Sequence, residues 1–193
     1  MRKIEKKMYN WIDAKLKDNG VAQHAIVNRD ARLLLVCAAQ ACVGVREEGG
    51  NNRGEIVELI QETIGSAAAE PWCMSLVQTL IAYVENRFHI VSPVFATEHV
   101  QTCWNKTDQD QRIRFYPLPG AIIIWRKGSS SSGHTGIVYA TDGDVMWALE
   151  GNTEKGLEDG KVVRDGGGVY LVKRNIRGTG NMMVRGFLKP FQA

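Results

Sequence analysis

The sequence lacks the features that would direct a chain into or across a membrane. No stretch approaches the roughly 18 consecutive apolar residues that a membrane-spanning helix needs, so no membrane span is expected. The basic segment at residues 2–7 is interrupted by Glu5 and is followed by no apolar block, which argues against a secretory signal. We therefore expect synthesis in the cytoplasm without a signal peptide.

Clustered basic residues and paired cysteines are also missing. The net charge is only +3, and no run of Lys and Arg is interleaved with aromatic residues, so no nucleic-acid partner is indicated. The four cysteines form no CxxC pair, and in a cytoplasm we expect them to be reduced. Cys37 and Cys42 fall in an apolar helical pattern and are interpreted as core residues.

The composition is typical of one globular domain. A chain of 193 residues with 44% apolar and 23% charged residues can build a good core, and it shows neither an internal repeat nor a linker. We expect a single domain over residues 1–193, with residues 1–28 as an N-terminal helical extension and residues 29–193 as the core. A monomer is expected.

Hydrophobic periodicity divides the chain into a helical half and a strand half. The pattern has a helical period up to about residue 104 and alternates after Pro117. The predicted helices cover residues 2–19, a segment capped by Asn28 or Asp30 and ending near 45, and residues 55–64, 73–87 and 99–104. The predicted strands cover residues 121–125, 135–140, 145–149, 161–164, 169–174 and 184–188. This order predicts an α+β fold, with helices packed on an antiparallel sheet of about five to six strands.

Cys73 stands at the beginning of the fourth predicted helix. Pro71 precedes it and suits a helix start, so Cys73 falls in the first turn. There the unpaired N–H groups and the positive end of the helix dipole favour a thiolate. From this stretch alone, a buried structural cysteine is an equally good interpretation.

His134 is the best candidate for a base that would act on this thiol. It opens a predicted strand, and small neighbours leave its imidazole access to a cleft. The next strand ends in Glu150-Gly151-Asn152, and a tight turn between antiparallel strands brings this segment close to His134. A carboxylate or amide there can hold the imidazole tautomer, although a hairpin with a chance histidine gives the same pattern.

A second cysteine offers weaker alternatives. Cys103 follows His99 by four residues, a spacing that would place both on one helical face as half of a metal site. No second pair of ligands is visible, so no metal is expected. Cys103-Trp104 is also a rival nucleophile window, but no glycine or proline begins a helix before it.

The order of cysteine on a helix, histidine on a strand and Glu-x-Asn on the next strand resembles the CHAP family, the cysteine, histidine-dependent amidohydrolases/peptidases of the papain-like superfamily. The resemblance extends from about Arg46 to Leu188. It rests on the motifs Pro71-Trp72-Cys73, Leu118-Pro119-Gly120, Gly133-His134-Thr135-Gly136-Ile137-Val138 and Glu150-Gly151-Asn152, and on the polar loop Glu47 to Gly54, which resembles that of phage-type members.

The resemblance implies a papain-like fold and a site for cleaving amide bonds of bacterial peptidoglycan. By position, Cys73 matches the nucleophile, His134 the general base, Glu150 the orienting residue and Asn152 a supporting polar group. The backbone N–H of Cys73 would be one donor to the oxyanion.

Three further residues are candidates for substrate binding. Trp72 would form a wall of the cleft, although packing of the helix against the sheet is its favoured role. Glu47 and Asn52 would line the substrate groove, and a solvated glycine-rich loop is an equally good interpretation of both.

Two departures from the family pattern limit the prediction. Ala121 stands where many members have an acidic residue, and residues 64–69 contain no carboxylate cluster, so neither calcium nor another cofactor is expected. No wall-binding module is recognisable.

The expected function is an N-acetylmuramoyl-L-alanine amidase or endopeptidase that acts on the wall after release or delivery, as an antibacterial phage lysin or an injected effector. The alternatives are a non-catalytic wall- or protein-binding module and a cysteine peptidase acting on proteins.

Overall fold

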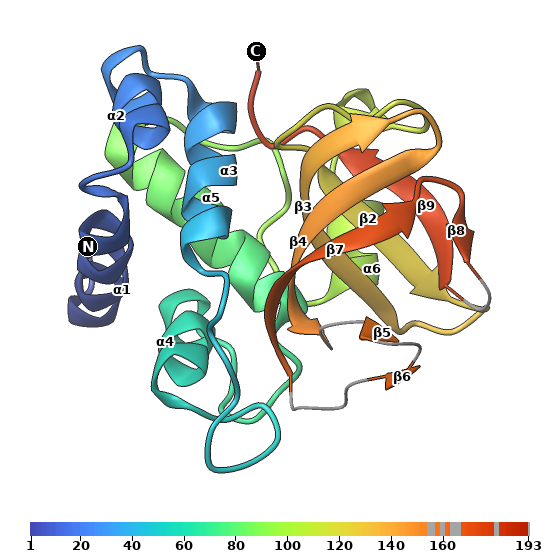
Figure 1. Ribbon diagram of the computed structural model, residues 1–193, viewed down its shortest axis with the longest axis horizontal. Coiled ribbons are helices and arrows are strands. Elements are labelled where there is room, and N and C mark those ends of the chain that lie inside the picture. Colours follow the sequence, from blue (N-terminus) through green and yellow to red (C-terminus); the bar gives the residue numbers. More distant parts are fainter. Residues whose placement is uncertain (154–156, 159–160, 163–166, 180–181, 193) are drawn as a thin grey trace.

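The computed structural model describes residues 1–153, 157–158, 161–162, 167–179 and 182–192 (Figure 1). Most of the helices gather on one side of the molecule, and the sheet lies on the other (Figure 1). The helices are α1 (Lys3–Leu16), α2 (Gly20–Val27), α3 (Ala31–Ala41), α4 (Glu55–Ile64), α5 (Cys73–Phe88) and α6 (Val100–Lys106), with a 3-10 turn at Gln109–Gln111.

The main sheet is antiparallel, with the strand order β1-β9-β2-β3-β4-β7 and β8 paired to β9. Its strands are β1 (Arg112–Ile113), β2 (Ile122–Lys127), β3 (Gly133–Asp142), β4 (Val145–Thr153), β7 (Gly168–Asn175), β8 (Gly178–Thr179) and β9 (Met182–Leu188). A separate pair is formed by β5 (Leu157–Glu158) and β6 (Lys161–Val162). The predicted α+β class is confirmed, and five of the sheet's strands are longer than two residues.

Helix α5 is the centre of the molecule. It lies between the N-terminal helices and the sheet, packing on α3 and α4 on one side and on β3 and β4 on the other (Figure 1). All residues from Cys73 to Ile81 are buried, so the first turns of the helix are covered around their whole circumference. A helix segment that is buried on all sides has packing partners on all sides, and this central position holds its first residue, Cys73, in place.

The helical boundaries differ from the prediction at Asn19 and near residue 45. Asn19 was expected to end the first helix, but its side chain accepts a hydrogen bond from the Ala22 backbone N–H at 3.0 Å and begins α2. Helix α3, capped by Asp30, ends at Ala41 rather than near residue 45. The reason is that residues 44–47 pair with the start of β7, through Gly44 N–H to Val169 O and Glu47 N–H to Gly167 O among other bonds.

The strand half also differs in detail. Residues 161–162 form β6 outside the main sheet, and the remainder of the predicted strand, residues 163–164, lies outside the described residues. Strands β3 and β4 are longer than predicted and extend to Gly133 and Thr153. These extensions carry the residues of the candidate site.

The N-terminal helix belongs to the same core as the central helices. Met8, Ile12 and Leu16 of α1 are buried in the cluster that contains the apolar residues of α3, α4 and α5. Cys37 and Cys42 are buried in that cluster as free thiols, so their interpretation as core residues is confirmed. Across the described ranges, no helix is both long enough and apolar enough to cross a membrane.

Candidate active site

Cys73 is the first residue of α5 and lies at the edge of an open groove of about 560 Å³. Its residue surface is 7% exposed. Trp72 takes the N-cap position, and the backbone of α5 becomes helical from Cys73 onward. The N–H groups of the first helical turn have no partner within the helix, so the thiol lies beside the positive end of the helix dipole.

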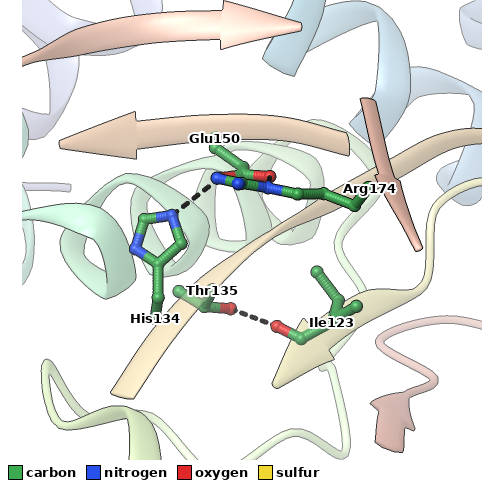
Figure 2. A network of polar contacts seen from close by, with 5 residues as sticks. All are labelled: Ile123, His134, Thr135, Glu150 and Arg174. Carbon is green, nitrogen blue, oxygen red and sulfur yellow. Dashed lines mark hydrogen bonds and ion pairs between the residues drawn. The ribbon is translucent and has the colours of Figure 1, made fainter. Parts of the chain in front are cut away.

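His134 projects from β3 between the cysteine and a carboxylate. Its Nε2 atom lies 2.9 Å from Oε2 of Glu150 (Figure 2). On its other side, a side-chain hydrogen bond with Cys73 is one of the interactions that raise its pKa. The imidazole also stacks on the ring of Trp125, with 5.5 Å between centroids and 22° between planes. Since Nε2 is engaged by Glu150, Nδ1 is the ring nitrogen left for Cys73.

Glu150 is a carboxylate with no exposed surface, held between two cationic groups. Arg174 of β7 donates from Nε to Oε1 at 2.8 Å and from Nη2 to Oε2 at 2.6 Å, so its guanidinium binds both oxygens (Figure 2). Burial alone would raise the pKa of Glu150, but the hydrogen bonds and positive charges of Arg174 and His134 outweigh it and lower the pKa.

The electrostatics of the site favour a protonated imidazole. Burial lowers the pKa of His134, but hydrogen bonds to Cys73 and Glu150 and the negative charges of those groups raise it to about 10. An imidazolium between a thiol and a carboxylate is suited to hold a thiolate and then to give a proton away.

Three segments distant in the sequence form the walls of the groove. The loop before α5 supplies Glu70, the start of α6 supplies Glu98 and His99, and the turn before β3 supplies Ser131 and Ser132. His99 is well exposed and lies 3.4 Å from the Glu98 carboxylate. Sequence reasoning did not place Glu98 or His99 near Cys73, because only the tertiary fold brings α6 to the groove.

The predicted substrate-binding residues lie behind the groove. Trp72 is fully buried, and its indole N–H donates to Oε1 of Glu47 at 2.9 Å, so it packs the start of α5 and has no surface left for substrate. Asn52 is buried, and its Nδ2 atom donates to the backbone oxygen of Ala69 at 3.1 Å. Glu47 is partly exposed and supports Trp72. The contacts of Trp72 agree with its packing role, whereas the buried Asn52 lies neither in the lining of the groove nor in a solvated loop.

Asn152 lies on the β-bulge at the end of β4, with a φ of 53°. Within the described ranges, no hydrogen bond joins its side chain to His134 or Glu150. The structure thus brings together Cys73, His134 and Glu150 and leaves Asn152 beside them. The supporting role of Asn152 stays a prediction.

The alternatives built on Cys103 do not fit the geometry. Cys103 has no exposed surface, and its thiol donates to the backbone oxygen of Phe95 at 3.4 Å. Burial raises the pKa of this thiol to about 11, although hydrogen bonds with Thr107 and Gln78 act in the opposite direction. No group of three or more His, Cys, Asp or Glu side chains suited to a metal was found among the residues with described positions.

Sequence reasoning missed Arg174 and Trp125. Trp125 faces His134 across the β2–β3 pair. In the register of β4 and β7, Glu150 pairs with Tyr170, and Arg174 lies further along β7. A strand pattern could assign Arg174 to an edge strand, but only the register of β4 and β7 and the reach of its side chain bring it to Glu150.

Residues 65–152 match the family model of the CHAP domain. The resemblance noted in the sequence is thereby confirmed over these residues, and it supports a peptidoglycan hydrolase of the amidase or peptidase type at the level of the family. The matched residues include Cys73, His134 and Glu150, whereas Arg174 lies beyond them. No curated protein and no solved structure matches the chain.

Proposed function

Taking the CHAP domain at residues 65–152 as the premise, we propose that this protein cleaves an amide bond of the peptidoglycan peptide through a cysteine thioester. The bond is the N-acetylmuramoyl-L-alanine amide or one within the peptide portion. The observation that carries the proposal is the place of His134, which lies 2.9 Å from Glu150 and interacts with Cys73 at the edge of an open groove.

The first step forms the thioester. The sulfur of Cys73 attacks the carbonyl carbon of the scissile amide, and the carbonyl oxygen becomes an oxyanion. The backbone N–H of Cys73, at the start of α5, is one donor for that oxyanion. As the C–N bond breaks, the imidazolium of His134 gives its proton to the leaving amine.

The second step releases the acid. His134, now neutral, takes a proton from a water molecule, and the resulting hydroxide attacks the thioester carbonyl. The C–S bond breaks and the sulfur of Cys73 leaves as a thiolate beside the reprotonated imidazole. Throughout both steps, Glu150 accepts a hydrogen bond from Nε2 of His134 and so keeps Nδ1 directed at the reaction.

The groove offers groups to which a peptide can bind. Glu70, Glu98, His99 and the Ser131-Ser132 pair surround Cys73 with hydrogen-bonding groups. A peptide portion with amides and charged ends can bind to such groups, and the groove is open enough to admit a branch of a larger polymer.

The test is digestion of purified peptidoglycan by the wild-type chain, Cys73→Ala and, as a matched control, Cys103→Ala. We expect the wild type and Cys103→Ala to release soluble fragments and Cys73→Ala to release none. Mass spectrometry of the fragments then identifies the new ends and the bond. Retained digestion by Cys73→Ala would contradict the proposal.

Two rival functions predict other outcomes. A non-catalytic binding module would sediment with peptidoglycan without releasing fragments from it. A cysteine peptidase acting on proteins would digest casein and leave purified peptidoglycan intact. The proposal also places the site of action at the cell wall, after release or delivery of the protein.

A further inference from the structure

Oε2 of Glu150 is shared by two donors. It lies 2.9 Å from Nε2 of His134 and 2.6 Å from Nη2 of Arg174. The other oxygen, Oε1, accepts a hydrogen bond from Nε of Arg174 at 2.8 Å. Because both oxygens are fixed by one planar guanidinium, the carboxylate cannot rotate away from His134 without breaking a bidentate ion pair.

Trp125 contacts both cationic partners of Glu150, which are Arg174 and His134. The guanidinium of Arg174 lies 5.6 Å from the centroid of the Trp125 ring, and the imidazole of His134 is stacked on that tryptophan. Trp125 is nearly fully buried on β2, so it provides a rigid surface for both side chains. Arg174 is thus held by Glu150 and by the aromatic ring against which the base is packed.

Removing Arg174 would leave the carboxylate with one charged partner. Glu150 is fully buried, and a buried carboxylate that loses a hydrogen-bonded cation either moves or takes up a proton. Either response changes the acceptor offered to His134. A lysine could restore the charge but not the two parallel hydrogen bonds, because its ammonium group carries all its donors on one nitrogen atom.

We propose that Arg174 is a positioning residue of this active site, which fixes the carboxylate of Glu150 so that Oε2 stays aimed at Nε2 of His134. The proposal rests on the proposed function, since it assigns Arg174 a part in the same reaction. Arg174 does not line the groove that holds Cys73, so it acts through Glu150 rather than on the substrate.

The kinetic test compares Arg174→Ala, Arg174→Lys and Arg177→Ala on soluble peptidoglycan fragments. Arg177 is a matched control just beyond the end of β7, because it is exposed and pairs with Asp144 rather than with Glu150. We expect kcat to fall by about 100-fold in Arg174→Ala, as for a misplacement of roughly 1 Å, with KM nearly unchanged. Arg174→Lys should recover only part of the loss, and Arg177→Ala should match the wild type.

Chemical rescue separates positioning from a merely structural role. The side chain of Arg174 is 34% exposed, so a small cation can enter the space that Arg174→Ala vacates. Guanidinium ion at non-denaturing concentration should restore part of kcat in Arg174→Ala, and methylammonium should restore less. Unchanged kcat in a folded Arg174→Ala, or a loss that appears only in KM, would overturn the proposal.

A measurement independent of substrate distinguishes failure of this proposal from failure of the proposed function. The rate at which iodoacetamide alkylates Cys73, mapped by mass spectrometry, reports the thiol–imidazole pair alone. If the wild type digests no peptidoglycan but Arg174→Ala slows alkylation and guanidinium restores it, positioning by Arg174 stands and the assigned substrate is wrong. Equal alkylation rates in the wild type and folded Arg174→Ala would overturn the positioning role, whatever the substrate.

Discussion

Gly136 leaves the space that Glu150 occupies. A Cβ atom at Gly136 would lie 2.7 Å from Cγ of Glu150 and 2.8 Å from the backbone oxygen of Leu149. Real Cβ atoms essentially never approach neighbours so closely, so the glycine is needed where β3 faces β4. The Gly-His-Thr-Gly motif thus supplies both the base and the room for the carboxylate that orients it.

Gly136→Ala should therefore lower both stability and activity. The methyl group would push on the Glu150 side chain and on a backbone carbonyl, and such overpacking typically costs about 1–3 kcal/mol. Denaturant unfolding would measure the loss, and alkylation of Cys73 would measure the displaced Glu150–His134 pair. Gly20→Ala is the matched control, since a Cβ there meets nothing within 4 Å, and its free energy of unfolding should not fall. Equal stability of the two variants would contradict the steric argument.

Glu150→Gln tests the orienting carboxylate itself. The amide keeps the shape of the side chain but removes the charge shared by His134 and Arg174, so the imidazolium of His134 loses the carboxylate that stabilises and orients it. We expect kcat on peptidoglycan fragments to fall on the order of 10³-fold or more. Asp144→Asn is the control, since its ion pair with Arg177 lies on the exposed surface. Near-normal kcat in a folded Glu150→Gln protein would remove Glu150 from the reaction.

The raised pKa of His134 predicts how stability depends on pH. An unfolded histidine has a pKa of about 6.5, whereas that of His134 is raised to about 10 by Cys73 and Glu150 despite burial. The fold therefore favours the protonated form. Its contribution to the free energy of unfolding is fully present below about pH 6.5 and is lost as the pH rises through about 10.

Denaturant unfolding at about pH 6, 8 and 10 checks this dependence. The wild type should lose stability across the series, and His134→Gln should lose less because its side chain does not titrate. A parallel decline in the two proteins would show that other groups cause the loss.

Trp72→Phe tests whether this residue packs or binds substrate. The change deletes the indole N–H that donates to Glu47 and leaves a small void, for an expected loss of about 2–4 kcal/mol in the free energy of unfolding. Because the indole is fully buried, KM of the folded variant should stay close to that of the wild type. A raised KM with unchanged stability would restore the substrate-binding interpretation. Glu47→Gln, which keeps an acceptor for the indole, should lose less stability.

The bounds of a helix could be predicted where residues typical of helix ends flank its apolar pattern on both sides. Helix α4 was predicted at its observed bounds, because Gly54 and Gly65 flank one clear apolar pattern. Asn19-Gly20 failed as a stop signal since an asparagine before a glycine can also cap the next helix, as it does here for α2.

Within the sheet, the site was predictable only where consecutive strands carry it. His134 and Glu150 lie on consecutive strands joined by a tight turn, so their approach followed from chain order. Arg174 and the groove residues Glu98 and His99 reach the site through the sheet register and the docking of α6, which no short sequence pattern encodes. Trp72 was ambiguous because a tryptophan beside a nucleophile can form a wall or fill a core.

The pairing of residues 44–47 with the start of β7 makes the helical layer and the sheet depend on each other for backbone hydrogen bonds. Gly44 N–H bonds to Val169 O, and Val169 N–H bonds in return to Val45 O. Separation of the layers would leave these donors and acceptors unpaired and would expose the outer edge of the strand that carries Arg174. Amide hydrogen exchange at Gly44, Val169 and the α5 backbone should accordingly occur through one shared opening, so that the catalytic helix and the strand of its positioning arginine are lost together.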